Sequence, residues 1–93
     1  MANNININPD APKYRAIAKE CTDKYGFKKL LYKVNRKTIC YVSYPNEFAE
    51  GFRMCGNGFC YDLHPTIDKP KKSAEDFLNR LYGAFGGVVI DYQ

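Results

Sequence analysis

The sequence lacks most of what enzymes use for catalysis. It contains one histidine, His64, no tryptophan, no glycine-rich phosphate loop and no convincing pair of acidic residues. No apolar run approaches the ~18 residues that a membrane-spanning helix needs. The opening stretch MANNININ has neither the basic nor the apolar region of a signal peptide. These absences predict a cytoplasmic protein that is not an enzyme, does not enter a membrane and has no small-molecule substrate.

Cysteine is present, but four residues in 93 are fewer than a disulfide scaffold carries. Without a secretory signal, we expect reduced thiols. Cys55 and Cys60 flank a predicted tight turn, so a disulfide between them is one alternative. A zinc site is another, although the tight CxxC spacing is missing; its ligands would be Cys55, Cys60 and His64, with Cys40 as the fourth. Otherwise no cofactor is expected.

Positive charge is concentrated in one part of the chain. The formal net charge is only +4, yet residues 13–37 hold nine cations against two anions, while residues 38–68 carry a net charge of −3. A surplus of this size in so short a segment exceeds what solubility needs and indicates an anionic partner. A solvated surface without a partner is the alternative.

The fold is expected to begin after a loose, asparagine-rich arm of residues 1–9, with residues 10–93 forming a single α+β domain. A first helix is predicted over residues 11–25, because apolar residues from Tyr14 to Tyr25 recur at three- and four-residue spacing. Gly26 follows at the position where a left-handed helix cap would lie.

Two β-hairpins are predicted next. Residues 27–34 and 38–44 are β-prone and flank a three-residue loop, with alternate residues forming an apolar face. Residues 52–56 and 59–63 flank Asn57-Gly58, a pair that type I′ turns favour because both central residues need positive φ. In this second hairpin Cys55 is expected opposite Cys60.

A second helix is predicted to start at Ser73 in a capping box, after a proline-rich loop of residues 64–72, and residues 88–92 are predicted to form the last strand. The resulting order is α-β-β-β-β-α-β. This order indicates an α+β fold with a mainly antiparallel sheet and two helices packed on one face.

The charge distribution favours binding of nucleic acid through the first helix, the first hairpin and the basic run before the second helix. Cations on a rigid frame reach phosphates, and aromatic rings stack on exposed bases. The predicted contact residues are Lys13, Arg15, Lys19, Lys29, Lys33, Arg36, Lys37, Tyr41, Lys69, Lys71 and Lys72.

A protein-binding module is the second interpretation. Small basic domains rich in Asn, Lys and Tyr, and without a catalytic site, are typical of phage or mobile-element proteins that inhibit a host protein, for example a nucleic-acid-processing or defence enzyme. Such a role needs an aromatic patch with Arg and Tyr anchors. The sequence leaves both interpretations open.

Overall fold

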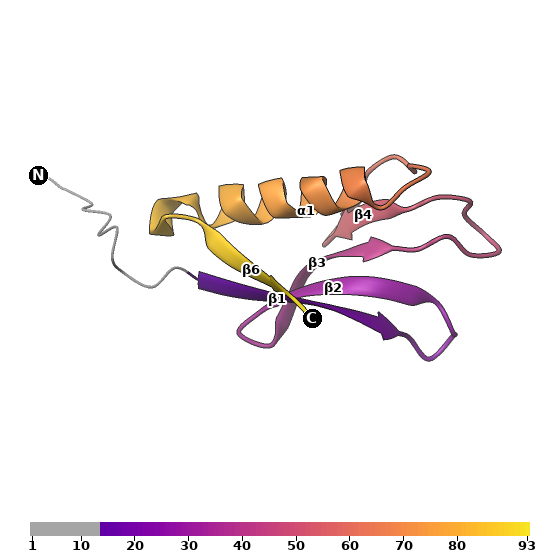
Figure 1. The fold of residues 1–93 in the computed structure, drawn as a ribbon, viewed down its shortest axis with the longest axis horizontal. Helices are drawn as coiled ribbons and strands as arrows, with labels where there is room; N and C mark the ends of the chain where they lie inside the picture. The colour runs from indigo at the N-terminus through magenta and orange to yellow at the C-terminus, as the bar shows by residue number, and fades with distance from the viewer. Residues whose placement is uncertain (1–13) are drawn as a thin grey trace, which may run out of the picture.

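Residues 14–93, the part of the chain that the computed structural model describes, form a mixed six-stranded sheet with one long helix on one face (Figure 1). The sheet order is β5-β4-β3-β2-β1-β6; neighbouring strands are antiparallel except for β1 and β6, which are parallel. The predicted arm and Lys13 lie outside the described residues. The elements are β1 (Tyr14–Thr22), β2 (Lys28–Val34), β3 (Lys37–Ser43), β4 (Arg53–Gly56), β5 (Phe59–Cys60), helix α1 (Asp68–Leu81), the 3-10 turn η1 (Gly83–Phe85) and β6 (Val88–Tyr92).

The predicted first helix is wrong, and with it the predicted element order and the prediction of two helices on one face of the sheet. In its place, β1 lies inside the sheet between β2 and β6. Ala16 and Ala18 are fully buried on one side of β1, while Ile17 and Cys21 are half-buried on the other. Because both sides of this strand carry apolar residues, its pattern also fits a helical stripe. Pairing with β2 on one side and with β6, distant in the sequence, on the other outweighs the local helical pattern.

The β2–β3 hairpin turns through two residues, Asn35 and Arg36, and not through the predicted three. Both have positive φ, 52° and 68°, as a type I′ turn requires. A register shift between Tyr32 and Lys33 offsets the shorter turn, so most of the predicted apolar face is retained. Thr38, expected on that face, is exposed. The buried residues of the face are Leu30, Tyr32, Val34, Cys40 and Val42.

The β4–β5 hairpin confirms the predicted pairing of Cys55 with Cys60. The predicted type I′ turn is wrong, because Gly58 has a positive φ of 86° and Asn57 does not. Phe59 lies directly over Gly56, where a Cβ would overlap the aromatic ring. A glycine at this position therefore lets the ring pack flat on the sheet.

Helix α1 begins at Asp68, before the predicted Ser73, so the basic run lies in its first turns and not in a loop. Pro70 is tolerated there because an N–H in the first turn has no helical acceptor. Pro70, Ala74 and Leu78 are buried, one turn apart, and form the stripe that contacts the sheet. Within residues 14–93 no helix is both long and apolar enough to cross a bilayer.

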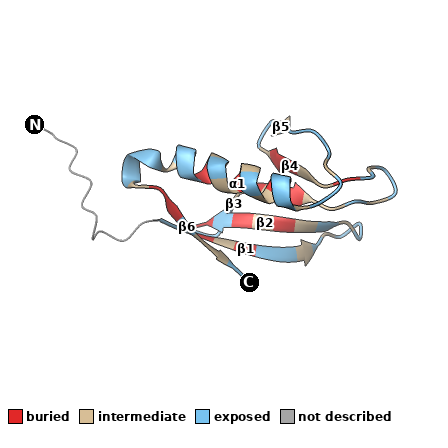
Figure 2. Ribbon diagram, turned by 45° about the horizontal axis from the view of Figure 1, so that its top comes forward, coloured by how far each residue is buried: buried red, intermediate tan, exposed pale blue. Residues whose placement is uncertain are grey.

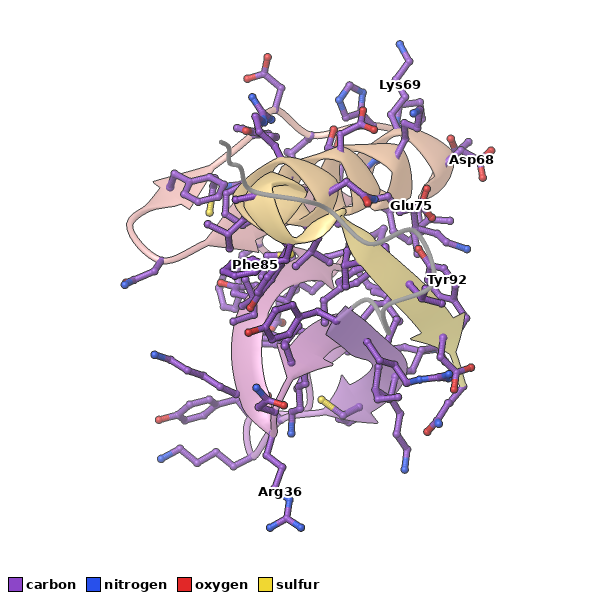
Figure 3. The ribbon with its side chains drawn as sticks, turned by 90° about the vertical axis from the view of Figure 1, so that its left-hand side faces the viewer. Arg36, Asp68, Lys69, Glu75, Phe85 and Tyr92 are labelled. Carbon is purple, nitrogen blue, oxygen red and sulfur yellow. The ribbon has the colours of Figure 1, made fainter. Side chains whose placement is uncertain are left out.

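Polar contacts tie α1 to β6, and β6 to β2. The Tyr32 and Tyr92 hydroxyls lie 2.8 Å apart, and the Tyr92 hydroxyl donates to Glu75 Oε2 at 2.6 Å (Figure 3). Burial raises the pKa of Tyr32 to about 12, so its hydroxyl stays neutral. Asn79 Oδ1 accepts the Val88 N–H at 3.1 Å. The buried residues of the sheet, apart from Cys55, form one core cluster with Ala74 and Leu78 of α1. Figure 2 shows the buried positions of the strands and of α1 in red.

Candidate nucleic-acid interface

The side of the sheet that faces away from α1 carries the basic residues of the first two strands. Residues alternate between the two faces of a strand. Since Ala16 and Ala18 lie beneath α1, their neighbours in β1 face the other way, and the strand pairing extends this assignment to β2 and β3. No helix or strand of the described chain covers this side. We call it the open face; it comprises Arg15, Ile17, Lys19, Cys21, Lys29, Leu31, Lys33 and Tyr41.

Two lysines and three apolar residues form a shallow hollow of about 110 Å³ on the open face. Lys19 lies opposite Leu31, and Lys33 lies opposite Ile17, so the lysines are diagonal neighbours across β1 and β2. Among residues 14–93, neither Lys19 nor Lys33 forms an ion pair. Both ammonium groups are therefore available to an external anion. The hollow is lined by Ile17, Lys19, Cys21, Leu31 and Lys33.

The other two cations that β1 and β2 place on the open face have acidic partners. Arg15 Nη1 lies 3.6 Å from Asp91 Oδ2. Lys29 Nζ lies 3.3 Å from Asp23 Oδ2 and 5.1 Å from the centre of the Tyr41 ring. The Arg15–Asp91 pair is exposed and contributes little to stability, and the Lys29–Asp23 pair is half-buried. Solvent reaches both pairs, so a phosphate can compete for both cations.

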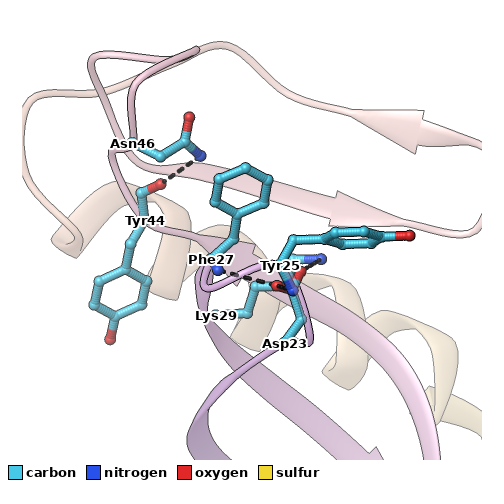
Figure 4. A network of polar contacts seen from close by, with 6 residues as sticks. All are labelled: Asp23, Tyr25, Phe27, Lys29, Tyr44 and Asn46. Atoms are coloured by element: carbon cyan, nitrogen blue, oxygen red, sulfur yellow. Dashed lines mark hydrogen bonds and ion pairs between the residues drawn. The ribbon is translucent and has the colours of Figure 1, made fainter.

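Asp23 organises the turn between β1 and β2 (Figure 4). Its Oδ1 accepts the N–H groups of Tyr25 and Phe27 at 2.9 and 3.0 Å. The Phe27 N–H, followed by the Tyr25 N–H and the Lys29 ammonium, holds the pKa of Asp23 below its usual value. The backbone reverses at Gly26, whose φ is 86°. This turn holds Tyr25 outward, with 71% of the residue exposed.

A second exposed aromatic residue lies close to this turn. Phe48, in the loop between β3 and β4, is 79% exposed, and its ring meets the edge of Phe27 at 5.9 Å between centroids. Asn46 Oδ1 accepts the Phe48 N–H at 2.7 Å. Tyr25 and Phe48 were not among the predicted contact residues. The signal in the sequence is an aromatic residue between turn-forming residues, where no core is available to bury it.

The predicted contact residues do not form one surface. Four cations and Tyr41 share the open face, whereas Arg36 and Lys37 lie at the β2–β3 turn. The three lysines of the basic run lie on α1, in the other layer, and Figure 3 places Arg36 and Lys69 on opposite sides of the molecule. On α1, Lys71 lies 4.4 Å from the centre of the Tyr92 ring, and Lys72 pairs with Asp76 at 3.0 Å.

The geometry gives the zinc alternative no support. No group of three or more His, Cys, Asp or Glu residues within the described chain is arranged to hold a metal ion. Cys40 belongs to the core beneath α1, whereas Cys55 pairs with Cys60 away from that core. All four thiols are free. Burial raises the pKa of Cys40 to about 12 and that of Cys55 to about 11, so both are protonated at neutral pH.

The open face thus combines free ammonium groups, replaceable ion pairs, small apolar patches and two exposed rings at one end. This arrangement suits a flexible polyanion that carries flat apolar groups. Comparison with protein-family models, with curated proteins and with solved structures finds no match to this chain.

Proposed function

We propose that the protein binds single-stranded nucleic acid through the open face and catalyses no reaction on it. The observation that supports this most is the pair Lys19 and Lys33. These lysines lie side by side without acidic partners, next to Ile17 and Leu31, on a sheet face left uncovered by the described helix and strands.

Phosphate contacts supply the affinity. Lys19 and Lys33 bind phosphates directly, while Arg15 and Lys29 exchange a surface carboxylate for a phosphate at little cost. Each phosphate neutralised releases condensed counterions, and for single strands the logarithm of the affinity falls with a slope of roughly −0.7 per contact. With the four cations of β1 and β2 as contacts, we expect a slope between about −2 and −3.

Single strands are favoured over duplexes because their bases are accessible. The apolar patches around Ile17 and Leu31 can accept the flat face of a base. At the end of the sheet, Tyr25 and Phe48 present exposed rings on which further bases can stack. A duplex keeps its bases stacked inside and would use only the cations.

Binding of a protein is the second candidate function. The observation that favours it is an apolar groove between α1 and β5, lined by Phe59, Phe77 and Leu81. A phage or mobile-element protein that inhibits a host enzyme would need such a surface. Its basic open face would also suit the acidic surface of a nucleic-acid-processing enzyme.

The test is a titration of fluorescently labelled oligonucleotides, single- and double-stranded, DNA and RNA, at about 50 and about 200 mM salt. We expect micromolar or tighter binding of the single strands at low salt, weaker binding of the duplexes, and the salt dependence given above. Absence of binding at the lower salt concentration would reject the proposal.

A matched pair of variants locates the surface. Lys19→Glu/Lys33→Glu reverses two charges on the open face, and Lys69→Glu/Lys72→Glu makes the same change in net charge on α1. We expect the first variant to lose about tenfold or more in affinity, equivalent to at least ~1.4 kcal/mol, and the second to lose much less. Equal losses would mean that net charge alone drives binding.

A further inference from the structure

A long groove runs between the C-terminal half of α1 and the β4–β5 hairpin. Two adjoining hollows of about 670 and 540 Å³ share Phe59, Phe77 and Leu81 as lining residues. Tyr61 lines the first hollow and Ile39 the second. Leu81 is 52% exposed and Tyr61 43% exposed, so a large apolar area is left open to solvent. We call this the α1–β5 groove.

The groove has rigid walls. Phe59 is held over Gly56 and packs against Phe77 and Tyr61, with ring centroids 5.3 and 5.4 Å apart. Phe77 comes from α1, whose neighbouring residue Leu78 is fully buried on the sheet. Because these rings are already in place, a ligand would bind without paying the entropy of ordering them.

An unpaired strand segment lies along one side of the groove. Strand β3 begins at Lys37, but β4 pairs only with Cys40–Ser43. Within the described part of the chain, Lys37 and Thr38 therefore have strand partners on the β2 side alone, and Ile39, at the register shift, pairs with neither neighbouring strand. Such an edge can pair with an added strand from another protein.

Among residues 14–93, the charged residues that line the groove are cations. Arg80 lines the first hollow and Lys37 the second, and no aspartate or glutamate of this part of the chain lines either. Neither cation forms an ion pair among residues 14–93. The groove thus pairs an apolar floor with positive charge, which complements a segment that is apolar and acidic.

We propose that the α1–β5 groove binds an extended segment of a protein partner in which acidic and apolar residues alternate. The segment adds as a short strand beside Lys37–Ile39, places apolar side chains against Phe59 and Leu81, and places carboxylates near Arg80 and Lys37. A second copy of this chain fits less well, because its net charge is +4. The inference rests on the second candidate function, protein binding, and is independent of nucleic-acid binding.

The test uses a synthetic peptide that alternates glutamate and valine, with a lysine–valine peptide as its counterpart, titrated into the ¹⁵N-labelled protein and followed by NMR. We expect the acidic peptide to shift the amide signals of Ile39, Phe59 and Leu81. Leu81→Lys and Arg80→Glu should each weaken the binding of the acidic peptide about tenfold. Val89→Lys is the control, because Val89 is 47% exposed on β6; it should leave the affinity unchanged.

Three outcomes would overturn the inference. The first is equal binding of the two peptides or no binding of either. The second is a set of shifts confined to the open face. The third is a dimer of the free protein that Leu81→Lys dissociates, which would make a second copy the occupant. If single-stranded DNA binding persists while peptide binding fails, only this inference is lost; if Leu81→Lys abolishes both, the two surfaces were wrongly separated.

Discussion

The open face and the α1–β5 groove lie in different parts of the same small sheet and differ in what they expose. The open face belongs to three long strands, β1 with nine residues and β2 and β3 with seven each. The groove lies beside β4, with four residues, and β5, with two. The first surface presents cations separated by small apolar residues, whereas the second presents aromatic and aliphatic side chains with cations at their margin.

Strand length explains this difference. Where strands pair along their whole length, side chains sort strictly between two faces, and the face without a helix keeps its charges in water. Where strands are short, they cover less of α1, and Phe77 is left half-buried and Leu81 exposed beside the hollow. Short edge strands thus create an apolar hollow at the same time as they limit edge pairing.

Removal of a side chain from the shared core has the largest expected effect on stability, since both surfaces depend on it. Leu78 is fully buried between α1 and the sheet. We expect Leu78→Ala to lower the free energy of unfolding by about 3 kcal/mol, measured by urea denaturation. Leu81→Ala, at a half-exposed position in the groove, should cost less than about 1 kcal/mol. Equal costs would show that the groove residues also belong to the core.

Substitution of the two exposed rings tests the contribution of base stacking separately from that of charge. We expect Tyr25→Ala/Phe48→Ala to weaken the binding of single-stranded DNA by about 1–3 kcal/mol for each stacked base that is lost. Duplex binding and the salt slope should not change, because no cation is removed. The measurement is the oligonucleotide titration at two salt concentrations. An equal loss on duplex DNA would argue against stacking.

The hydroxyl network beneath α1 has a smaller expected effect. Tyr92→Phe removes the hydrogen bonds to Glu75 and Tyr32 but keeps the ring. We expect a loss of about 1 kcal/mol in thermal or urea unfolding. Tyr61→Phe, at a groove residue whose hydroxyl forms no side-chain hydrogen bond within the described chain, should change stability by less than ~0.5 kcal/mol. If Tyr92→Phe left the free energy of unfolding unchanged, the hydroxyl network would not contribute to holding the helix on the sheet.

The turn at Asp23 has the smallest expected effect on stability, and the sign of its pH dependence follows from the lowered pKa. The pKa of Asp23 is lowered in the folded state, mainly by the Phe27 N–H. Its carboxylate therefore stabilises the turn at pH values above the unfolded pKa, about 4, and this contribution disappears as the pH falls through the lower folded pKa. A ¹³C NMR titration of the Asp23 carboxyl should give a midpoint below pH 3.8. Asp23→Asn should remove the pH dependence of the Phe27 amide signal.

The local hairpins could be predicted from the sequence, and the first strand could not. The pairing of Cys55 with Cys60 follows from the short distance along the chain and from Gly58. Most of the buried face of β2 and β3 follows from the alternation of apolar residues, which the register shift interrupts at Thr38. β1 has apolar residues on both of its faces, so its pattern also fits a helix, and only pairing with β2 and β6 resolves it.

Only part of the candidate site could be predicted from the sequence, because the rest depends on β1 being a strand. Arg15, Lys19, Lys29 and Lys33 were predicted as contact residues from charge alone. Their common orientation depends on β1 being a strand, because in a helix Arg15 and Lys19 would not align with the lysines of β2. Lys69 was assigned to the same surface, although α1 places it in the other layer.

By itself the sequence determined the size of the positive charge in the first third of the chain, the two hairpins and the amphipathic C-terminal helix, because each depends on residues close together in the chain. Only the tertiary structure decided which cations face the same way, which of them have acidic partners and where the apolar side chains of α1 are left uncovered. Those features arise from contacts between segments far apart in the sequence, and their energies are not encoded in any one segment.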